Sequence, residues 1–484
     1  MAERCLHAKC IDQCFIFDAG TQEYKVIVMM KTDTDTLFAK QALLATGWAS
    51  NVRITWNIAG NITALTTGEN KKSAEESVDI LLPGMSNLHC HSFQRAMAGL
   101  AEISHSPNDS FWTWRDLMYR FVGKLTPKDV QIIASFTYME MLQSGFTSIG
   151  EFHYLHQQPD GSKYDDPAEM ANMVIAGAKE TGIELTMLPV FYAHSDFGGA
   201  VPDPRQNRFV HDLDNFQLLI DSLRQQNSEI IIGIAPHSLR ATTPEQLTEL
   251  LSNNPNYPVH IHIAEQMAEV RACEQHLGTR PVQWLLDNYQ IDDRWCLVHA
   301  THMNKNEITQ MANSRAVAGL CPITEANLGD GIFAGVDYAK ANGKFGIGSD
   351  SCVRIDLADE LRTLEYSQRL RDQKRVRLAP TKTSVGGHLY RQAAKDGAQA
   401  LGQNNGNIAI GKTASFVALD ATMPSLAGRS KDAIIDGWVF ASQKSPVTDV
   451  WVLGKQVLKN QNHQKQQEIT NDYIKCLRRL LADD

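Results

Sequence analysis

The chain has 484 residues, of which 43% are hydrophobic and 21% are charged, and its formal net charge is -9. These values are typical of a globular protein with a large core, and the acidic balance disfavours nucleic acid as the main partner, because phosphate binding usually needs a basic face. No stretch approaches the roughly 18 apolar residues of a membrane helix, and charged residues interrupt the N-terminus where a signal peptide needs an apolar core, so we expect a cytoplasmic protein without a membrane partner.

Residues 1–35 match no element that their pattern can assign, and we interpret them as an N-terminal extension of unknown role. The nine cysteines of the chain are scattered, which does not fit a disulfide framework. Cys5, Cys10 and Cys14 form a small group with His7. Their spacing fits no common zinc pattern, so plain thiols are the preferred interpretation and a metal clip is the alternative.

Short strands are predicted next, over Leu37–Thr46, Val52–Trp56 and Ile62–Thr66, with a hairpin turn at Gly60. An apolar run then leads into His89. It has the character of a buried strand that ends in polar residues.

From there to about residue 400, helical stretches alternate with short apolar runs. The helical stretches include Lys128–Ser144, Pro167–Thr181 and Pro244–Leu251. The runs are Leu81–Leu88, Ser148–Gly150, Leu185–Val190, Ile230–Ile234, Val259–Ile263, Cys296–Val298, Ala316–Leu320 and Phe345–Ile347. Strands that alternate with helices predict parallel βα units, and about eight of them predict an α/β fold, a (β/α)8 TIM-like barrel over residues 83–404.

After residue 404 the chain returns to short predicted strands, namely Ile408–Ile410, Ala414–Leu419, Val439–Ala441 and Val450–Leu453. We predict that the two β-rich ends, residues 36–82 and 405–460, form one small β-sandwich domain beside the barrel. Residues 461–484 are predicted to form a C-terminal helical tail.

Histidines stand at the ends of the candidate strands. His89 and His91 share one strand face, since residues i and i+2 point to the same side. His260 and His262 are related in the same way, and spacing alone does not decide which of them binds a metal ion. A single pair of this kind is more often two ordinary surface or core histidines than a metal site.

Two further strand ends carry His299 and Asp350, and Glu265 follows His262 by three residues. Alone, Asp350 could be a helix N-cap and Glu265 a solvated residue at a helix start. In barrel enzymes, however, the C-terminal ends of the strands build the active site. A nitrogen-rich group there predicts a divalent metal ion, which zinc fits well and iron also fits.

The order of these residues resembles the amidohydrolase superfamily from Leu82 to about Leu419, and PGMSNLHCHSFQRAMAG resembles its first-strand motif. The resemblance implies one metal ion, and it prefers His262 to His260 as a ligand. The implied ligands are His89, His91, His262 and Asp350. Two-metal members carry a lysine at the fourth strand, and EIIIGIAPHS contains none, which implies a mononuclear site.

The resemblance also implies the catalytic residues, which are Glu265, His299 and Asp350. Zinc lowers the pKa of a bound water to roughly 7. Glu265 would take a proton from this water and pass it to the departing nitrogen. His299 would orient the water or stabilise charge, and Asp350 would accept a hydrogen bond from the water as well as bind the metal.

Local segments resemble one family within this superfamily, the formimidoylglutamate deiminases. They are LFAKQALLATGW, HSFQRAMAGLAE, DSFWTWRDLMY, GEFHYLHQQPDG, APHSLRA and SDSCVRIDLADELRTLEYSQRLR. The family hydrolyses N-formimino-L-glutamate to N-formyl-L-glutamate and ammonia in histidine degradation. The implied substrate-binding residues are Gln94, Arg115, Tyr154, His237 and Arg240. Two arginines suit a substrate with two carboxylates, because each guanidinium can bind one carboxylate through paired hydrogen bonds.

Two alternatives remain at this point. The first is another deaminase of this branch, which acts on guanine, an adenosine-type substrate or a triazine. The second is an assembly protein without a metal, although such relatives usually lack the ligands that this chain retains. The expected partner is a small dicarboxylate amidine, and the expected assembly is a homodimer.

Overall fold

The computed structural model describes residues 12–18, 23–29, 34–103 and 111–482; of residues 12–18, 23–29 and 111–113 it describes the backbone only. Strands β1 (Asp12–Asp18) and β2 (Glu23–Met29) pair antiparallel. Cys5, His7 and Cys10 of the predicted thiol group lie outside the described residues, and Cys14 lies in β1.

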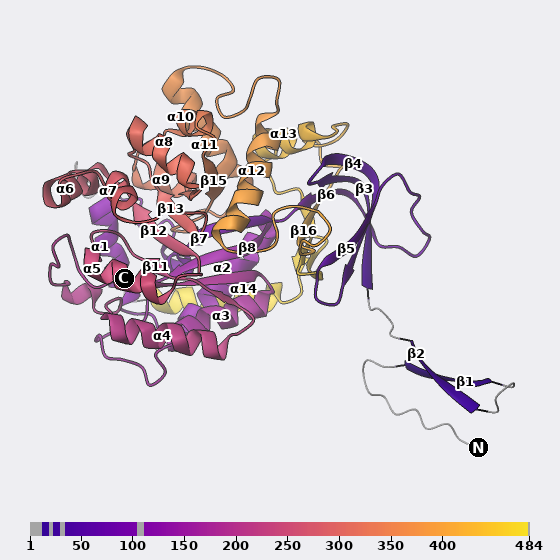
Figure 1. Cartoon of the computed structure of the whole chain (residues 1–484), viewed down its shortest axis with the longest axis horizontal. Helices are drawn as coiled ribbons and strands as arrows, with labels where there is room; N and C mark the ends of the chain where they lie inside the picture. The colour runs from indigo at the N-terminus through magenta and orange to yellow at the C-terminus, as the bar shows by residue number, and fades with distance from the viewer. Residues whose placement is uncertain (1–11, 19–22, 30–33, 104–110, 483–484) are drawn as a thin grey trace.

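A barrel of parallel strands lies inside the larger body of the molecule, with helices around it (Figure 1). Its strands are β7 (Met85–Cys90), β8 (Phe146–His153), β9 (Glu184–Phe191), β10 (Ile231–Ile232), β11 (Ala235–Pro236), β12 (Val259–Ile263), β13 (Trp295–His299), β14 (Val317–Leu320) and β15 (Lys344–Ile347). Strands β10 and β11 both pair with β9 and act as one interrupted strand. The ring closes where Ile234 bridges Val259 in parallel. The predicted (β/α)8 fold is therefore confirmed.

Helices surround this barrel in the sequence order that the βα pattern predicts (Figure 1). They are α1 (Phe111–Val122), α2 (Pro127–Ser144), α3 (Glu169–Thr181), α4 (Leu213–Gln226), α5 (Pro244–Asn253), α6 (Met267–Leu277), α7 (Pro281–Asn288), α8 (Lys305–Ser314), α9 (Pro322–Leu328), α10 (Gly335–Lys340), α11 (Leu357–Asp372) and α12 (Val385–Ala400). Their boundaries follow from capping chemistry. In α2, Thr126 and Asp129 form a capping box, Pro127 opens the first turn, and Gly145 ends the helix with a left-handed φ of 105°.

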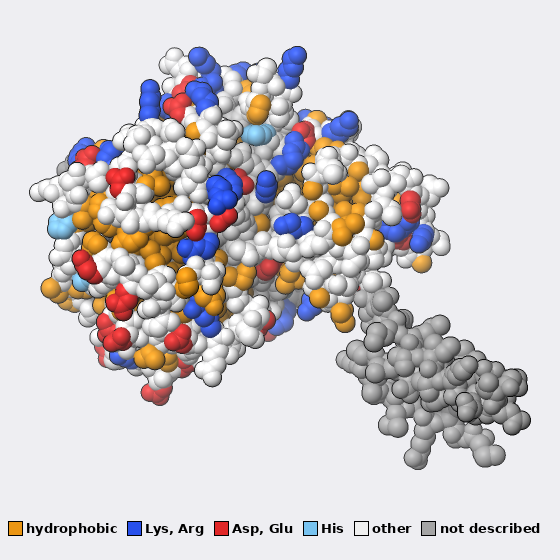
Figure 2. Space-filling view, viewed as in Figure 1, with side chains coloured by type: hydrophobic (Ala, Val, Ile, Leu, Met, Phe, Trp, Pro, Cys, Tyr) orange, Lys and Arg blue, Asp and Glu red, His pale blue; other side chains and the backbone are white. Residues whose placement is uncertain are grey.

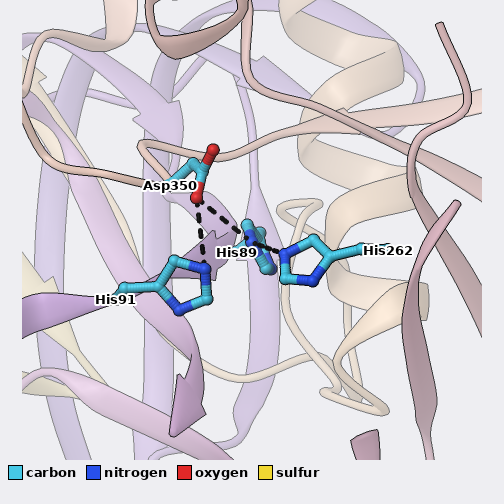
Figure 3. Close-up of side chains that lie close together, drawn as sticks. All are labelled: His89, His91, His262 and Asp350. Carbon is cyan, nitrogen blue, oxygen red and sulfur yellow. Dashed lines mark hydrogen bonds and ion pairs between the residues drawn. The ribbon is translucent and has the colours of Figure 1, made fainter. Parts of the chain in front are cut away.

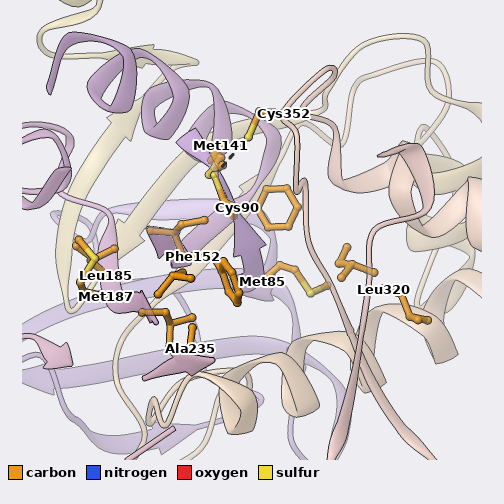
Figure 4. Packing of buried hydrophobic residues seen from close by; sticks show 14 of the residues in the cluster. Met85, Cys90, Met141, Phe152, Leu185, Met187, Ala235, Leu320 and Cys352 are labelled. Atoms are coloured by element: carbon orange, nitrogen blue, oxygen red, sulfur yellow. Dashed lines mark hydrogen bonds between the residues drawn. The ribbon is translucent and has the colours of Figure 1, made fainter. Parts of the chain in front are cut away.

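The barrel core is apolar because parallel strands are covered on both faces. All residues of β8 and β12 are buried. Figure 4 shows how side chains from neighbouring strands pack together, among them Met85, Phe152 and Leu320, which are each at most 1% exposed. A well-packed scaffold of this kind holds the residues at the strand ends in fixed positions.

The two ends of the chain pair with each other, as predicted, although they form one eight-stranded sheet and not two packed sheets. Its strands are β3 (Thr34–Leu44), β4 (Gly47–Asn57), β5 (Ile62–Thr66), β6 (Ser77–Pro83), β16 (Phe416–Leu419), β17 (Val447–Val452), β18 (Lys455–Lys459) and β19 (Asn462–His463). In the order of pairing, β6 and β3 separate β16 from β4, yet the rings of Trp56 and Phe416 lie only 5.8 Å apart. The sheet must therefore curl over its own hydrophobic cluster, and in this way it buries side chains as a sandwich does.

Two of the predicted strands are wrong. Residues 439–441 belong to helix α13 (Asp432–Ala441), where Ile434, Ile435, Trp438 and Val439 are buried at helical spacing. Residues 408–410 form no strand, because Ile408 is buried under the sheet while Ile410 is 64% exposed at a turn. The predicted C-terminal helix is present as α14 (Gln466–Leu480).

The surface agrees with the composition. On the face shown in Figure 2, acidic and basic side chains are interspersed and no continuous basic area is visible. Among the helices that the structure describes, none combines the length and the hydropathy needed to cross a membrane.

Candidate active site

Four side chains from three barrel strands meet at the C-terminal end of the barrel (Figure 3). His89 and His91 come from the end of β7, His262 from β12, and Asp350 follows β15. His89 Nε2 lies 3.0 Å from His262 Nε2 and 3.4 Å from Asp350 Oδ1, and His91 Nε2 lies 3.2 Å from the same oxygen. All four donor atoms lie within 4.8 Å of one another, which is the arrangement a single cation requires.

The protonation of these residues also suits a cation. Burial lowers the pKa of His89 to about 3 and the pKa of His262 well below its usual value, so both imidazoles are neutral. Neutral imidazole nitrogens that face each other need a cation or a shared proton between them. His91 Nδ1 lies 2.8 Å from the carbonyl oxygen of Phe152, which keeps the proton on Nδ1 and leaves Nε2 bare toward the centre. Three nitrogens and one carboxylate oxygen fit a zinc-type ion.

His260 lies outside this group, although it is on the same strand as His262. Its Nε2 lies 2.8 Å from the carbonyl oxygen of Ala400, and the side chain is fully buried. The structure therefore places His262, and not His260, among the candidate ligands.

Glu265 and His299 lie beside the metal-ligand group. His299 Nε2 is 3.8 Å from Glu265 Oε1 and 3.8 Å from Asp350 Oδ2. Burial raises the pKa of Glu265 to about 7, an effect that Asp350 strengthens and His299 opposes. A carboxyl group with this pKa can both accept and release a proton near neutral pH.

The backbone is strained at two of these residues. His299 has a φ of 66° and Asp350 a φ of 44°, both in the left-handed region that side chains other than glycine rarely adopt. Each such residue costs about 1–3 kcal/mol, and such strain is concentrated at functional sites. Both positions therefore agree with a role in function.

Three carboxyl groups that the sequence did not single out lie close to this centre, and two of them, Glu325 and Asp330, are buried. Glu325 Oε1 lies 3.3 Å from His299 Nδ1 and accepts the backbone N–H of Cys321 at 2.9 Å. Glu269 accepts the backbone N–H of Glu265 at 3.0 Å. Asp330 lies close to Glu265 and His299, and burial raises its pKa to about 9. They come from segments after β12 and β14, and no spacing rule links them to the strand ends.

The raised pKa of Glu265 predicts the pH dependence of turnover. Only the deprotonated carboxylate can accept a proton, so we expect kcat to rise with pH and to level off above an apparent pKa of about 7 or lower, because a bound cation lowers this pKa. The measurement is kcat at saturating substrate from pH 5 to 9. A kcat that falls between pH 5 and pH 7 would contradict the assignment of Glu265 as the base.

A cavity of about 710 Å³ opens onto the metal-ligand group. It is lined by all five predicted substrate-binding residues, which are Gln94, Arg115, Tyr154, His237 and Arg240. Gln94 Nε2 donates to the Tyr154 hydroxyl at 2.6 Å, and the Tyr154 ring lies 4.9 Å from the His91 ring. Gln94 and Tyr154 therefore lie at the metal end of the cavity.

The comparisons with known proteins agree with this geometry. Residues 80–457 match the Amidohydrolase family, and residues 34–79 match the family described as Formimidoylglutamate deiminase HutF, N-terminal domain. A formimidoylglutamate deiminase from Pseudomonas aeruginosa is 46% identical over 449 residues, which cover 92% of this chain and 99% of that protein.

Solved structures share the fold. A crystal structure of an amidohydrolase from Brucella melitensis matches with a TM-score of 0.88 and 45% identity, over 92% of this chain and 100% of that one. An adenosine deaminase from Xanthomonas campestris, solved with bound zinc, matches with a TM-score of 0.75 over 92% of this chain and 98% of that one. At 20% identity, this second likeness concerns the fold alone.

Proposed function

The chain belongs to the amidohydrolase family and, within it, to the formimidoylglutamate deiminases, and from this membership we propose that it hydrolyses N-formimino-L-glutamate to N-formyl-L-glutamate and ammonia in histidine degradation. The observation that carries the proposal is a single cavity that is lined both by a metal-ligand group and by two arginines. The metal group suits the amidine end of this substrate, and the arginines suit its carboxylates.

His89, His91, His262 and Asp350 would hold one divalent ion, and we propose zinc, with iron as the alternative. When bound, such an ion lowers the pKa of a water molecule toward neutrality and polarises the carbon under attack. The fourth strand region offers no lysine beside this group, which favours a mononuclear site.

Glu265 is the residue that moves protons in this proposal. Its carboxylate takes a proton from the attacking water and gives it to the terminal nitrogen of the formimino group, which leaves as ammonia. The bond between the formimino carbon and that nitrogen breaks, and the bond to the glutamate nitrogen survives. His299, which Glu325 orients through Nδ1, stabilises the charge that develops on the oxygen bonded to the tetrahedral carbon, and Asp350 accepts a hydrogen bond from the water.

Arg115 and Arg240 bind the carboxylates in this proposal, and their removal is expected to affect substrate binding. We expect Arg240→Met to raise KM for N-formimino-L-glutamate by about 10- to 100-fold, since a hydrogen bond to a charged group contributes about 1.5–3 kcal/mol. Arg478→Met, on the exposed face of α14, is the matched control and should leave KM unchanged. Steady-state kinetics of both variants would check this, and an unchanged KM in Arg240→Met would argue against carboxylate binding by this residue.

The competing hypothesis is that the protein is a deaminase that acts on a nucleobase. The test is ammonia release by the metal-loaded protein from N-formimino-L-glutamate, guanine and adenosine, compared as kcat/KM. We expect release from N-formimino-L-glutamate alone. Release from guanine or adenosine without release from N-formimino-L-glutamate would keep the metal chemistry and overturn the substrate.

We also propose that the protein acts in the cytoplasm as a homodimer, on a small molecule and without a nucleic acid or membrane partner. Residues 83–404 would form the catalytic domain, residues 36–82 and 405–460 the composite β-domain, and residues 461–484 the tail. Light scattering of the purified protein would test the dimer.

A further inference from the structure

Gln206 is a buried glutamine next to the cavity that contacts two tyrosines at once. It ends the short helix η2 (Pro204–Gln206) between β9 and α4, and its side chain is 2% exposed. Its Nε2 lies 2.9 Å from the Tyr119 hydroxyl and 2.8 Å from the Tyr192 hydroxyl. Both tyrosines line the cavity, whereas Gln206 does not.

The orientation of this amide group is determined by its other contact. Gln206 Oε1 accepts the backbone N–H of Asp203 at 2.8 Å, in the capping box that opens η2. A backbone N–H can only donate, so the reversed amide would place two donors against each other. The NH2 group must therefore face the tyrosines, and its two hydrogens are donated to the two phenol oxygens.

The phenol protons are consequently left for other acceptors. Each tyrosine oxygen already accepts a hydrogen bond from Gln206, and one phenol can donate to the other because the two hydroxyls are neighbours. At least one O–H still has no acceptor among the described residues. A buried hydroxyl usually has a hydrogen-bond partner, so we expect this O–H group to donate to a ligand bound in the cavity.

The surroundings of the two phenols indicate an anion as that partner. The Arg115 guanidinium lies 5.5 Å from the centre of the Tyr119 ring, and the Tyr192 ring lies 4.7 Å from the His237 ring. Burial raises the pKa of Tyr192 to about 12 although Arg240 and Arg115 lower it, so Tyr192 stays a neutral donor. Neutral O–H donors beside two guanidinium groups are suited to a carboxylate.

We propose that Tyr119 and Tyr192 donate a hydrogen bond to a carboxylate of the substrate, and that Gln206 is the positioning residue that turns their O–H groups toward it. The inference rests on the proposed function, because it assumes a dicarboxylate substrate. It adds to the two arginines at least one uncharged donor from this pair of phenols. An O–H donor of fixed direction can bind either oxygen of a carboxylate, whereas the NH2 group of an amide is itself a donor and cannot accept it.

The test compares Gln206→Glu, Tyr119→Phe and Tyr192→Phe with wild type. The glutamate side chain has the shape of the glutamine side chain, but its second oxygen would accept hydrogen bonds from the phenols, so their O–H groups would point away from the cavity. For N-formimino-L-glutamate we expect KM to rise about 10-fold or more in Gln206→Glu and in at least one Tyr→Phe variant, with kcat within about threefold and metal content unchanged. Tyr289→Phe, which removes an exposed hydroxyl outside the cavity, is the matched control.

Two substrate analogues identify which carboxylate of the substrate the phenols bind. N-formimino-L-glutamine and N-formimino-L-isoglutamine each replace one carboxylate by an amide. For the analogue that lacks the recognised carboxylate, wild type and the Tyr→Phe variants should have the same KM.

If wild type does not act on N-formimino-L-glutamate, the proposed function fails. If wild type acts on it and both Tyr→Phe variants keep the wild-type KM, this inference fails. If Gln206→Glu does not fold, the KM values of the two Tyr→Phe variants test the inference on their own.

Discussion

Replacement of Glu265 by glutamine is expected to reduce kcat by about 10²- to 10⁴-fold while the protein keeps its metal, because an amide has the shape of the carboxylate but cannot accept a proton. Glu265 lines the cavity, and burial raises its pKa to about 7, so its carboxyl group can exchange a proton near neutral pH. Glu265 Oε1 lies 3.8 Å from His299 Nε2, beside the group formed by the four candidate metal ligands but not part of it.

The measurement is kcat together with metal content for wild type, Glu265→Gln and Glu274→Gln. Glu274 lies on α6 with a side chain that is 45% exposed, outside the cavity, and serves as the matched control. Near-normal turnover in Glu265→Gln would remove Glu265 as the proton carrier. Loss of the metal in the same variant would show instead that Glu265 supports the ion.

Replacement of His262 by alanine is expected to weaken metal binding by more than 100-fold and to abolish measurable turnover. His262 supplies one of four donors, and its Nε2 faces His89 Nε2 at 3.0 Å. Replacing residues that only support metal ligands already costs about 10- to 100-fold in affinity, so the loss of a ligand should cost more.

His260→Gln is the matched control for this variant. His260 is buried on the same strand, but its Nε2 contacts the carbonyl oxygen of Ala400, and a glutamine amide can keep that contact. Metal content after dialysis, measured for both variants, separates the two histidines. Full occupancy in His262→Ala, or loss in His260→Gln alone, would mean that the ligand set is misassigned.

Much of this architecture could be predicted from the sequence because the pattern is local. Each apolar run that becomes a barrel strand is short and bounded by polar residues, and His89, His91, His262 and His299 stand at strand ends. The strand predicted at residues 439–441 was wrong because its apolar residues follow the helical period once Ile434 and Ile435 are included.

Other parts of the site could not be predicted from local patterns. Arg115 lies on α1 and reaches the cavity from outside the barrel strands, so only the family resemblance indicated it. Glu325 lies beside His299, and Asp330 lies beside Glu265 and His299, and their positions depend on how α9 and the loop after it pack. The sequence around Gln206 has one local signal, the Asp-Pro-Arg-Gln capping box. This signal predicts the start of a helix but not the contact between Gln206 and two tyrosines.

The products that the metal-loaded protein forms from N-formimino-L-glutamate identify the bond that it hydrolyses, and NMR with a parallel ammonia assay measures them. We predict N-formyl-L-glutamate and one equivalent of ammonia, because the bond to the terminal nitrogen breaks and the bond to the glutamate nitrogen survives. Formation of L-glutamate and formamide, or recovery of unchanged substrate, would contradict the proposed hydrolysis of the bond to the terminal nitrogen.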